Sequence, residues 1–211
     1  MQTVKLPLAK RLFDIIISVF LLILLYPFIV LVLFLMLLES IFIPASRGNF
    51  FYSETRISGG KPFTLYKFRI FKTHSINMFF DQNGFIQTKE LESDNRNFTY
   101  LGRFLKQIYM DELPQLICVL KGEMSLVGPR PTNPVNAQRW LLEGKYSKHL
   151  ITAGLTGYFQ CYKGIKLSRD QNETDMEYIE FCRNNSGWKV ILFDAKILII
   201  SAITVFKAQG I

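Results

Sequence analysis

Cysteine and histidine are both scarce in this chain of 211 residues, which holds three of the first and two of the second. Cys118, Cys161 and Cys182 lie far apart and form no C-x-x-C pair, so no disulfide framework is indicated and a reducing compartment is favoured for the polar part of the chain. His74 and His149 have no cysteine or second histidine at ligand spacing. A structural zinc site is therefore not expected.

Several catalytic signatures are missing as well. The sequence has no G-x-x-x-x-G-K-[ST] and no G-x-G-x-x-G, the phosphate-binding loops of P-loop and dinucleotide-binding folds. It has no D-x-D pair, which removes the metal-binding signature of many nucleotide-sugar glycosyltransferases. With two histidines and no G-x-S-x-G, a serine hydrolase is not indicated either.

Acidic residues are outnumbered, because 25 Lys and Arg stand against 17 Asp and Glu and give a formal net charge of +8. Such a charge calls for a negative partner, and nucleic acid, anionic lipid headgroups and phosphorylated substrates are the candidates. Basic residues beside a hydrophobic segment favour a membrane surface, where each contributes roughly 1 kcal/mol near the headgroups. We therefore expect anionic lipids, and no nucleic acid, among the partners.

One hydrophobic run stands out at residues 15–38, which contain no charged side chain. Lys5, Lys10 and Arg11 precede it as in a secretory signal peptide, but the run is longer than a signal's apolar region and no A-x-A-like cleavage site follows. A straight helix over this run would measure roughly 36 Å, enough to cross the hydrocarbon core of a bilayer. The run therefore indicates a membrane segment.

Pro27 lies near the middle of the run, where it removes a helix donor and crowds the carbonyl four residues earlier. Two outcomes are compatible with this proline: a bent spanning helix, and a re-entrant helix that enters and leaves through the same leaflet. Basic residues flank both ends of the run, with Arg47 and Arg56 on the far side. This distribution mildly favours two cytoplasmic ends but leaves both outcomes open.

The remaining chain predicts short helices and a small hairpin. Aromatic, β-prone runs flank Gly59 and Gly60, which indicates a hairpin between residues 49 and 71. Residues 75–97 are polar and are expected to form a loop. The apolar stretch 188–206 carries three charges, so a helix in the interface or packed on the core suits it better than a spanning one. Apolar spacing and turn residues predict helices at about 100–109, 112–120, 134–142 and 170–183, and a strand-to-turn segment at 125–131.

Asp111 and Glu112 are the adjacent carboxylates of greatest chemical interest. We expect Asp111 to begin the helix at 112–120, where the helix dipole and free backbone donors would keep it ionised. Such a pair would suit a nucleophile, a divalent cation and phosphate oxygens. The same local pattern is also typical of an ordinary helix cap, which is its more frequent meaning when it stands alone.

Basic residues in the polar part are candidates for phosphate binding. Arg69 and Arg130 could grip phosphate with two nitrogens, and Lys106 could neutralise it as a point charge. Lys67 and Arg69 alternate with aromatic residues at 66–69, as on one polar face of an edge strand. Each of these residues would ordinarily be a solvated surface charge.

Taken in order, these segments resemble the bacterial sugar transferase family, the monotopic polyprenyl-phosphate phosphoglycosyl transferases in their minimal form. The most specific segments are D-E-L-P-Q-L at 111–116 and G-E-M-S-L-V-G-P-R-P at 122–131. The likeness covers nearly the whole chain, and with it catalysis becomes the preferred role of Asp111. The other matching segments are K-R-L-F-D at 10–14, Pro27, Y-K-F-R at 66–69, L-G-R-F-L-K at 101–106, G-L-T-G at 154–157 and D-A-K-I at 194–197.

The resemblance implies an α+β, mostly helical monotopic membrane protein. Residues 1–48 would form an N-terminal re-entrant membrane helix broken at Pro27. Residues 49–211 would form a catalytic domain with a small β-hairpin and interfacial amphipathic helices. The implied location is the cytoplasmic face of the bacterial inner membrane, in contact with its anionic lipids.

The resemblance also implies a two-step, Mg²⁺-dependent reaction. Asp111 would attack the sugar-bearing phosphate of a UDP-sugar and release UMP, and polyprenyl phosphate, such as undecaprenyl phosphate, would then take the phosphosugar from the carboxylate. Glu112 would serve with Asp111 as a metal ligand or as an acid/base group. The product would enter capsule, O-antigen, exopolysaccharide or glycoprotein synthesis. The implied phosphate-binding residues are Lys67, Arg69, Lys106 and Arg130.

Three positions depart from the family pattern. Lys106 stands where relatives commonly carry arginine, Ile70-Phe71 stands where Thr-Met is usual, and residues 157–162 differ from the usual G-W-A-Q-V-N. The last difference bears on sugar or nucleotide recognition, and hexose, N-acetylated and amino-modified donors all stay open, as does the oligomeric state. Two rival hypotheses are a catalytically silent membrane-anchored binding protein and a spanning anchor with a periplasmic domain.

Overall fold

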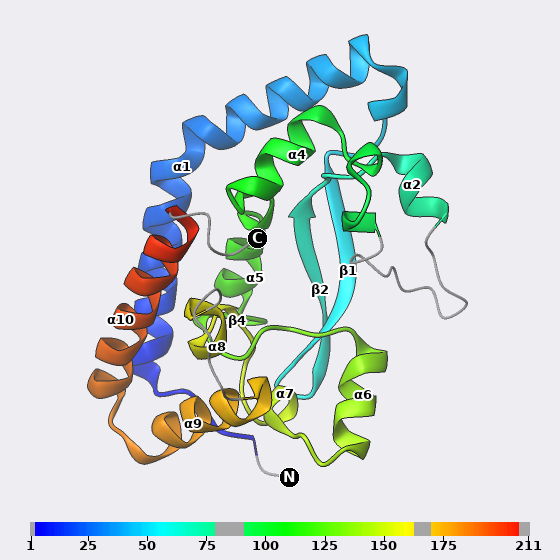
Figure 1. Cartoon of the computed structure of the whole chain (residues 1–211). Coiled ribbons are helices and arrows are strands. Elements are labelled where there is room, and N and C mark those ends of the chain that lie inside the picture. The colour runs from blue at the N-terminus through cyan, green and yellow to red at the C-terminus, as the bar shows by residue number, and fades with distance from the viewer. Residues whose placement is uncertain (1–2, 79–90, 163–169, 207–211) are drawn as a thin grey trace. The chain divides into compact units, whose positions relative to one another are not determined.

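The computed structural model describes residues 3–78, 91–162 and 170–206. Helices predominate in these ranges, beside a two-stranded hairpin and a second two-stranded sheet (Figure 1), which confirms the predicted α+β, mostly helical class. The chain divides into two compact units, each assembled from segments that are distant in sequence. The first unit comprises Met1–Leu21, Thr55–Leu65 and Gln115–Ile211, and the second comprises Leu22–Glu54 and Tyr66–Pro114.

The hydrophobic run forms one long helix, α1 (Leu8–Phe42), with Pro27 inside it. Of the helices in the described residues, α1 alone is long and apolar enough to cross a membrane by length and composition. Many of its large apolar side chains are exposed, as in a helix that faces lipid. A single missing donor leaves the flanking turns helical, so the residues on both sides of Pro27 belong to one helix. The predicted break in the direction of the helix at Pro27 stays a prediction. The re-entrant course through the membrane stays a prediction, as does the boundary at residue 48.

The predicted hairpin is confirmed by β1 (Phe51–Ser58) and β2 (Lys61–Phe68), which pair with each other. Gly59 and Gly60 connect the strands with φ angles of 54° and 78°. Two consecutive residues in the left-handed region are what the tightest hairpin turns require, and glycine adopts it without steric cost. The Gly-Gly signal therefore predicted this turn for the right physical reason.

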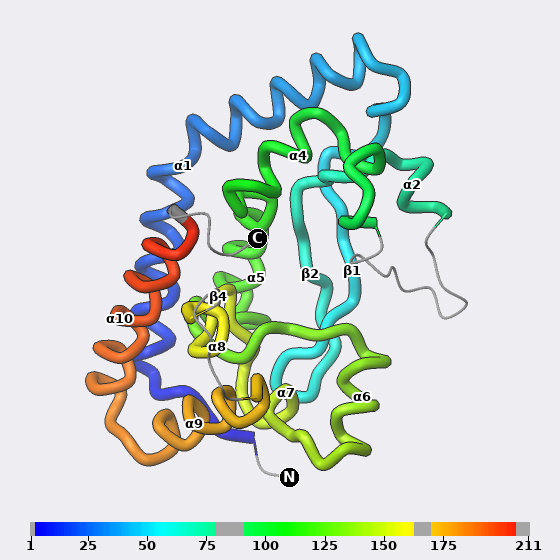
Figure 2. The backbone as a smooth tube through the Cα atoms, viewed as in Figure 1, coloured from blue at the N-terminus to red at the C-terminus, as the bar shows by residue number. Residues whose placement is uncertain are grey.

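The first unit is built around a short parallel sheet. Strand β3 (Ser125–Val127) pairs with β4 (Gly154–Thr156), with Ser125 opposite Gly154 and Val127 opposite Thr156. Helix α10 (Gly187–Phe206) contacts both strands, and α8 (Tyr158–Cys161) and α9 (Gln171–Asn184) pack against α10 and against each other, as can be followed along the backbone trace in Figure 2. The other helices of this unit after Pro114 are α5 (Gln115–Lys121), α6 (Pro134–Leu142) and α7 (Ser147–Leu150).

Glycines set the backbone spacing at the end of this sheet. A Cβ atom on Gly154 would meet the backbone N and O atoms of Gly128, and one on Gly157 would meet the same Gly128 carbonyl. A Cβ on Gly128 would in turn meet the carbonyl of Thr152. Side chains are excluded where backbones approach this closely, so these glycines serve packing.

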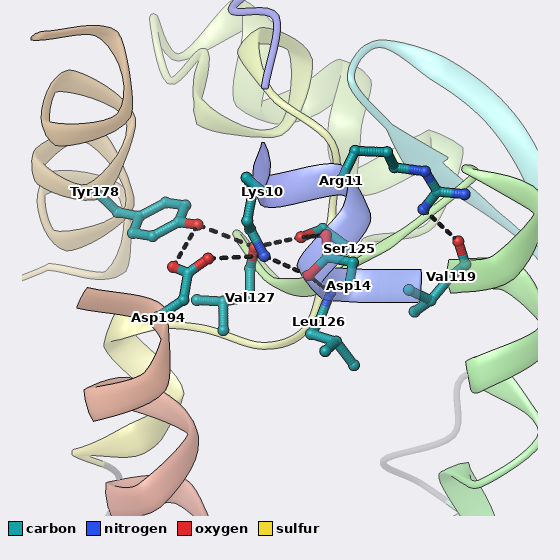
Figure 3. Close-up of polar contacts among 9 residues, drawn as sticks. All are labelled: Lys10, Arg11, Asp14, Val119, Ser125, Leu126, Val127, Tyr178 and Asp194. Carbon is teal, nitrogen blue, oxygen red and sulfur yellow. Dashed lines mark hydrogen bonds and ion pairs between the residues drawn. The ribbon is translucent and has the colours of Figure 1, made fainter. Parts of the chain in front are cut away.

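A buried ionic cluster joins the start of α1 to the rest of the first unit (Figure 3). The Nζ atom of Lys10 lies 2.5 Å from Asp14 Oδ1 and 2.7 Å from Asp194 Oδ2, and all three side chains are buried. The Ser125 hydroxyl donates to Asp14 Oδ2 at 2.8 Å, and the Tyr178 hydroxyl lies 2.9 Å from Asp194 Oδ1. The K-R-L-F-D segment at 10–14 and the D-A-K-I segment at 194–197 therefore meet in this cluster, where each buried charge finds a partner of opposite sign.

The second unit packs the latter part of α1 and the ends of the hairpin strands against short helices. Part of the predicted loop at 75–97 is helical, because α2 (Thr73–Met78) and the 3-10 turn η2 (Asn95–Asn97) lie within or across its ends. Residues 79–90 of that loop lie outside the described residues. The predicted helix at 100–109 is confirmed as α4 (Tyr100–Gln107). The buried core consists of Val32, Met36, Phe68, Ile70, Phe71, Ile76, Leu91, Phe98 and Leu105.

Candidate active site

Asp111 and Glu112 lie in a 3-10 turn, η3 (Met110–Glu112), and not at the start of a helix as predicted. The N–H of Leu113 donates to the carbonyl of Met110 at 3.3 Å across this turn. Pro114 has no N–H with which to continue the pattern, so α5 begins only after it. The capping role that the local pattern favoured is therefore wrong, and a tight turn holds both carboxylates.

Tyr109 introduces this turn with a φ of 55°, the one positive φ among the non-glycine residues that the structure describes. A bulky residue in the left-handed region costs of order 1–3 kcal/mol, and the surrounding structure must hold it there. Residues of this kind cluster at functional sites. Here the strained residue lies two positions before Asp111.

A pocket of about 30 Å³ lies beside Asp111 within the second unit. This volume suits a water molecule or a single ion. Asp111 is only 1% exposed, so the pocket reaches a carboxylate that bulk water scarcely touches. Three carboxylates face three cationic groups in the lining, whose polar members are Tyr52, Glu54, Lys67, Arg69, Glu92, Lys106 and Asp111.

An ion pair with Glu112 holds Lys67 next to the two adjacent carboxylates, Asp111 and Glu112. Its Nζ atom donates to Glu112 Oε1 at 2.9 Å, and the two side chains are 17% and 11% exposed. Strand β2 supplies Lys67, and η3 supplies Glu112. Burial to this extent reduces solvent screening, so the pair is stronger than an ordinary surface ion pair.

Lys106 reaches the same pocket from the last turn of α4. Its Nζ atom donates to Glu92 Oε1 at 2.8 Å, and about a third of each side chain is exposed. A partly exposed lysine keeps three donors on a flexible stem, so it can exchange a carboxylate for a phosphate oxygen. The structure thus brings four of the predicted residues to one pocket, with Glu112 bonded to Lys67. These four are Lys67, Arg69, Lys106 and Asp111.

Arg69 also lines the pocket, but its guanidinium is bonded to the backbone. Its Nε, Nη1 and Nη2 atoms donate to the carbonyls of Asn49, Phe71 and Ser46 at 2.6, 2.8 and 2.6 Å. Burial lowers the pKa of Arg69, while nearby Glu39 raises it in part. These contacts make Arg69 a clamp on the surrounding chain, and phosphate binding by it stays a prediction.

Arg130 belongs to the first unit, where it follows β3 and is exposed. It lies near Lys148, a buried residue whose Nζ donates to Asp175 Oδ2 at 2.6 Å. Burial lowers the pKa of Lys148, and the charge of Arg130 lowers it further. Arg130 is not among the residues that line the Asp111 pocket, and its binding of phosphate stays a prediction.

The family described as bacterial sugar transferase matches residues 5–208 of the chain. This chain belongs to the bacterial sugar transferase family. The conclusion agrees with the resemblance that the sequence segments carry.

Individual relatives of this sugar transferase extend beyond it. The UDP-glucose:undecaprenyl-phosphate glucose-1-phosphate transferase of Escherichia coli (strain K12) is 32% identical over 206 residues, which cover 95% of this chain and 40% of that protein. The undecaprenyl-phosphate glucose phosphotransferase of Komagataeibacter xylinus is 32% identical over 206 residues, covering 92% of this chain and 35% of its own length. The sugar transferase EpsL of Bacillus subtilis (strain 168), named as uncharacterized, is 35% identical over 153 residues, covering 72% and 67%. The chain therefore spans about two-fifths or less of the first two relatives.

Sequence reasoning missed three pocket residues of this transferase. Tyr52 and Glu54 lie on β1 two positions apart, and their side chains therefore share one face of the strand. That alternation was a usable signal, because the hairpin itself was predicted. Glu92 had no comparable signal, since it lies in a polar stretch without a periodic pattern.

The donor set of the pocket is compatible with Mg²⁺. Among the described residues there is no group of three or more Asp, Glu, His or Cys side chains that could hold a metal. Mg²⁺ commonly uses one or two carboxylates and completes its shell with water and substrate phosphates. Asp111 in the pocket lining and the adjacent Glu112, which bonds Lys67, are the two carboxylates that would hold it, and Mg²⁺ stays a prediction.

Proposed function

We propose that this transferase moves a phosphosugar from a UDP-sugar to polyprenyl phosphate, with Asp111 as the nucleophile. The observation that carries the proposal is the pocket in which the buried Asp111 carboxylate shares a lining with Lys67 and Lys106. The names of two relatives support the substrate classes, because both include undecaprenyl phosphate and glucose phosphate transfer.

In the first step an oxygen of Asp111 attacks the sugar-bearing phosphorus of the donor. A phosphorus–oxygen bond to the carboxylate forms, and the bond from that phosphorus to the bridging diphosphate oxygen breaks. UMP leaves with the electron pair of the broken bond. Because Asp111 is buried, little water can reach the phosphosugar ester that it then carries.

In the second step a phosphate oxygen of the polyprenyl phosphate attacks the same phosphorus. The bond between that phosphorus and Asp111 breaks, which restores the carboxylate and gives a polyprenyl diphosphosugar. Dividing the transfer in this way avoids bringing donor and acceptor together in one displacement.

Both steps bring anions together, and the pocket supplies positive charge to offset the repulsion. Lys67 is oriented by Glu112 at 2.9 Å, and Lys106 is held by Glu92 at 2.8 Å. Fixed cations in a site with little water stabilise developing phosphate charge more strongly than they would in solution. Mg²⁺, when bound, would neutralise further phosphate charge, and Asp111 with Glu112 would hold it.

Release of UMP from a UDP-sugar in the presence of undecaprenyl phosphate tests the proposal. We expect Asp111→Asn to abolish release, because an amide oxygen is a poor nucleophile toward phosphate. Asp94→Asn is the matched control, since Asp94 belongs to the same unit, caps η2 and bonds Arg96. Release that is unchanged in the Asp111 variant would exclude the mechanism.

Trapping gives an independent test of the covalent step. With donor alone, the wild-type protein should gain the mass of a phosphosugar on the peptide that contains Asp111. Product formation without that mass change would mean a direct transfer. A panel of UDP-glucose, UDP-N-acetylglucosamine and UDP-N-acetylgalactosamine would identify the sugar, because another relative is named for N-acetylgalactosamine phosphate transfer.

Membrane topology can be tested by labelling cysteines placed near residues 5 and 50 in intact cells. The native background is low because Cys118, Cys161 and Cys182 are all buried. A re-entrant helix with a cytoplasmic catalytic domain leaves both new positions unlabelled from outside. Labelling at either position would support a spanning anchor.

A further inference from the structure

Glu39 is the first charged residue after the hydrophobic run, near the end of α1. Its carboxylate accepts hydrogen bonds from a distant part of the second unit. Oε1 accepts the N–H of Tyr100 at 2.8 Å, and Oε2 accepts the N–H of Leu101 at 3.2 Å. Oε1 also accepts the hydroxyl of Ser46 at 2.8 Å. The end of α1 is thereby bonded to Tyr100 and Leu101, which follow Glu39 in sequence by 61 and 62 positions.

These contacts anchor the first turn of α4, which lies beside the latter part of α1 in Figure 1. Tyr100 and Leu101 are its first two residues, and Thr99 caps it by accepting the N–H of Gly102 at 2.9 Å. The first backbone donors of a helix have no partner within the helix, and a negative charge there also favours the helix dipole. Thr99 provides the local cap, so Glu39 adds a tertiary attachment.

Beyond its first two residues, α4 is fixed by close packing against the core of the second unit. A Cβ atom on Gly102 would meet the carbonyl oxygen and Cα of Ile70, so the helix lies directly on that backbone. Leu105 is fully buried in the core of the unit. Lys106 follows it immediately and projects to the pocket of Asp111. The attachment of the first turn of α4 to Glu39 adds to this packing in fixing where Lys106, in the last turn, is placed.

The same carboxylate is also linked to the strand that carries Lys67. Ser46 donates its hydroxyl to Glu39, and the Ser46 carbonyl accepts Arg69 Nη2 at 2.6 Å. Arg69 directly follows β2 and stands two positions after Lys67. Glu39, Ser46 and Arg69 thus form a continuous set of contacts from the end of α1 to the pocket.

We infer that Glu39 is a positioning residue of the active site, holding α4, and with it Lys106, at the Asp111 pocket from the end of the membrane helix. The inference rests on the proposed function, because it assigns Lys106 a part in that reaction. Glu39 itself touches no reacting atom. Its effect on the reaction passes through α4.

A double-mutant cycle on kcat/KM for UMP release separates positioning from general stabilisation. The four proteins are the full-length wild type, Glu39→Gln, Lys106→Met and the double variant, each in lipid nanodiscs. We expect Glu39→Gln alone to lower kcat/KM roughly fivefold, because the amide loses the negative charge at the first turn of α4 and one of the two acceptor oxygens. Once Lys106 is absent its position no longer matters, so Glu39→Gln should then cost less than about twofold.

Asp170→Asn is the matched control, because Asp170 caps α9 of the first unit by accepting the N–H of Asn172. Any loss that it causes should be the same with and without Lys106. An equal, multiplicative loss from Glu39→Gln in both backgrounds would overturn the inference, and so would no loss at all. Lys106→Met with full activity would also overturn it, while the Asp111→Asn test would still support the proposed function. Failure of the Asp111 test instead removes the proposed function itself.

Discussion

Asp194 should make the folded protein more stable as the pH falls from 8 to 5. Its carboxylate is fully buried, and burial raises its pKa to about 6, with Lys10 offsetting part of the effect. The cluster holds one lysine between two carboxylates, those of Asp14 and Asp194. With both carboxylates ionised a negative charge stays buried, so a proton on Asp194 relieves the cost.

The hydrogen bonds of the cluster can accommodate this proton (Figure 3). The Tyr178 hydroxyl lies 2.9 Å from Asp194 Oδ1 and 3.1 Å from the Val127 carbonyl. The Ser125 hydroxyl lies 2.8 Å from Asp14 Oδ2 and 2.9 Å from the same Val127 carbonyl. Two hydroxyl protons thus face three acceptors. A protonated Asp194 could donate to Tyr178, which would then donate to Val127.

The size and sign of the effect follow from linkage. A rise in the pKa of Asp194 from 3.8 in the unfolded chain to about 6 in the folded one corresponds to roughly 3 kcal/mol in total. A raised folded pKa means that this stability is fully present below pH 3.8 and is lost as the pH rises through 6. About half of it therefore falls between pH 8 and pH 5.

Urea unfolding in detergent micelles, followed by tryptophan fluorescence, measures this effect when the wild type is compared with Asp194→Asn at each pH. Asparagine cannot titrate, and other groups contribute equally to both proteins. The unfolding free energy of the wild type should gain about 1.4 kcal/mol on the variant between pH 8 and pH 5. If the difference in unfolding free energy between the wild type and Asp194→Asn stays constant from pH 8 to pH 5, the reasoning is refuted. Asp194 would then have the same pKa in the folded and the unfolded protein.

Other buried groups give further predictions. Asp175→Asn should lower the unfolding free energy by about 3 kcal/mol in urea, because Lys148 would stay buried without its carboxylate; a loss under 1 kcal/mol would contradict this. Gly154→Ala should lower the melting temperature by several degrees, because its Cβ meets backbone atoms, and an unchanged melting temperature would show that the sheet end adjusts. Cys161 and Cys182, whose pKa values burial raises to about 11 and about 12, should resist thiol reagents at pH 8 until the protein unfolds, and rapid labelling of the native protein would show that they are accessible.

Much of this fold could be predicted where one local rule dominates. The Gly59-Gly60 turn between β-prone runs gave the hairpin, and apolar spacing gave α4. The helix predicted at about 134–142 has the same bounds in the structure, where Pro134 occupies its first turn. In each case propensity and packing agree, so the local pattern is sufficient.

The candidate site shows where local rules fail. An acidic pair before a proline and an apolar run is typical of a helix start, yet η3 ends before Pro114 and α5 begins later. The clamp made by Arg69 depends on carbonyls of Ser46 and Asn49, which lie 23 and 20 positions away. Contacts of this kind are set by tertiary packing, and no spacing in one sequence encodes them.

Helix α1 is not a simple tail on a soluble catalytic domain. Its first turns supply Lys10 and Asp14 to the cluster around Asp194, and near its end Glu39 satisfies two donors of α4. A chain limited to residues 49–211 would leave the buried Asp194 and Ser125 without Lys10 and Asp14, at about 1–3 kcal/mol each. Losses of this size are a large share of a total stability of roughly 5–15 kcal/mol. Both compact units include part of α1, because the polar residues near each end of this helix are bonded within one of the units. The predicted domain boundary at residue 48 therefore concerns which residues contact lipid, and it stays a hypothesis.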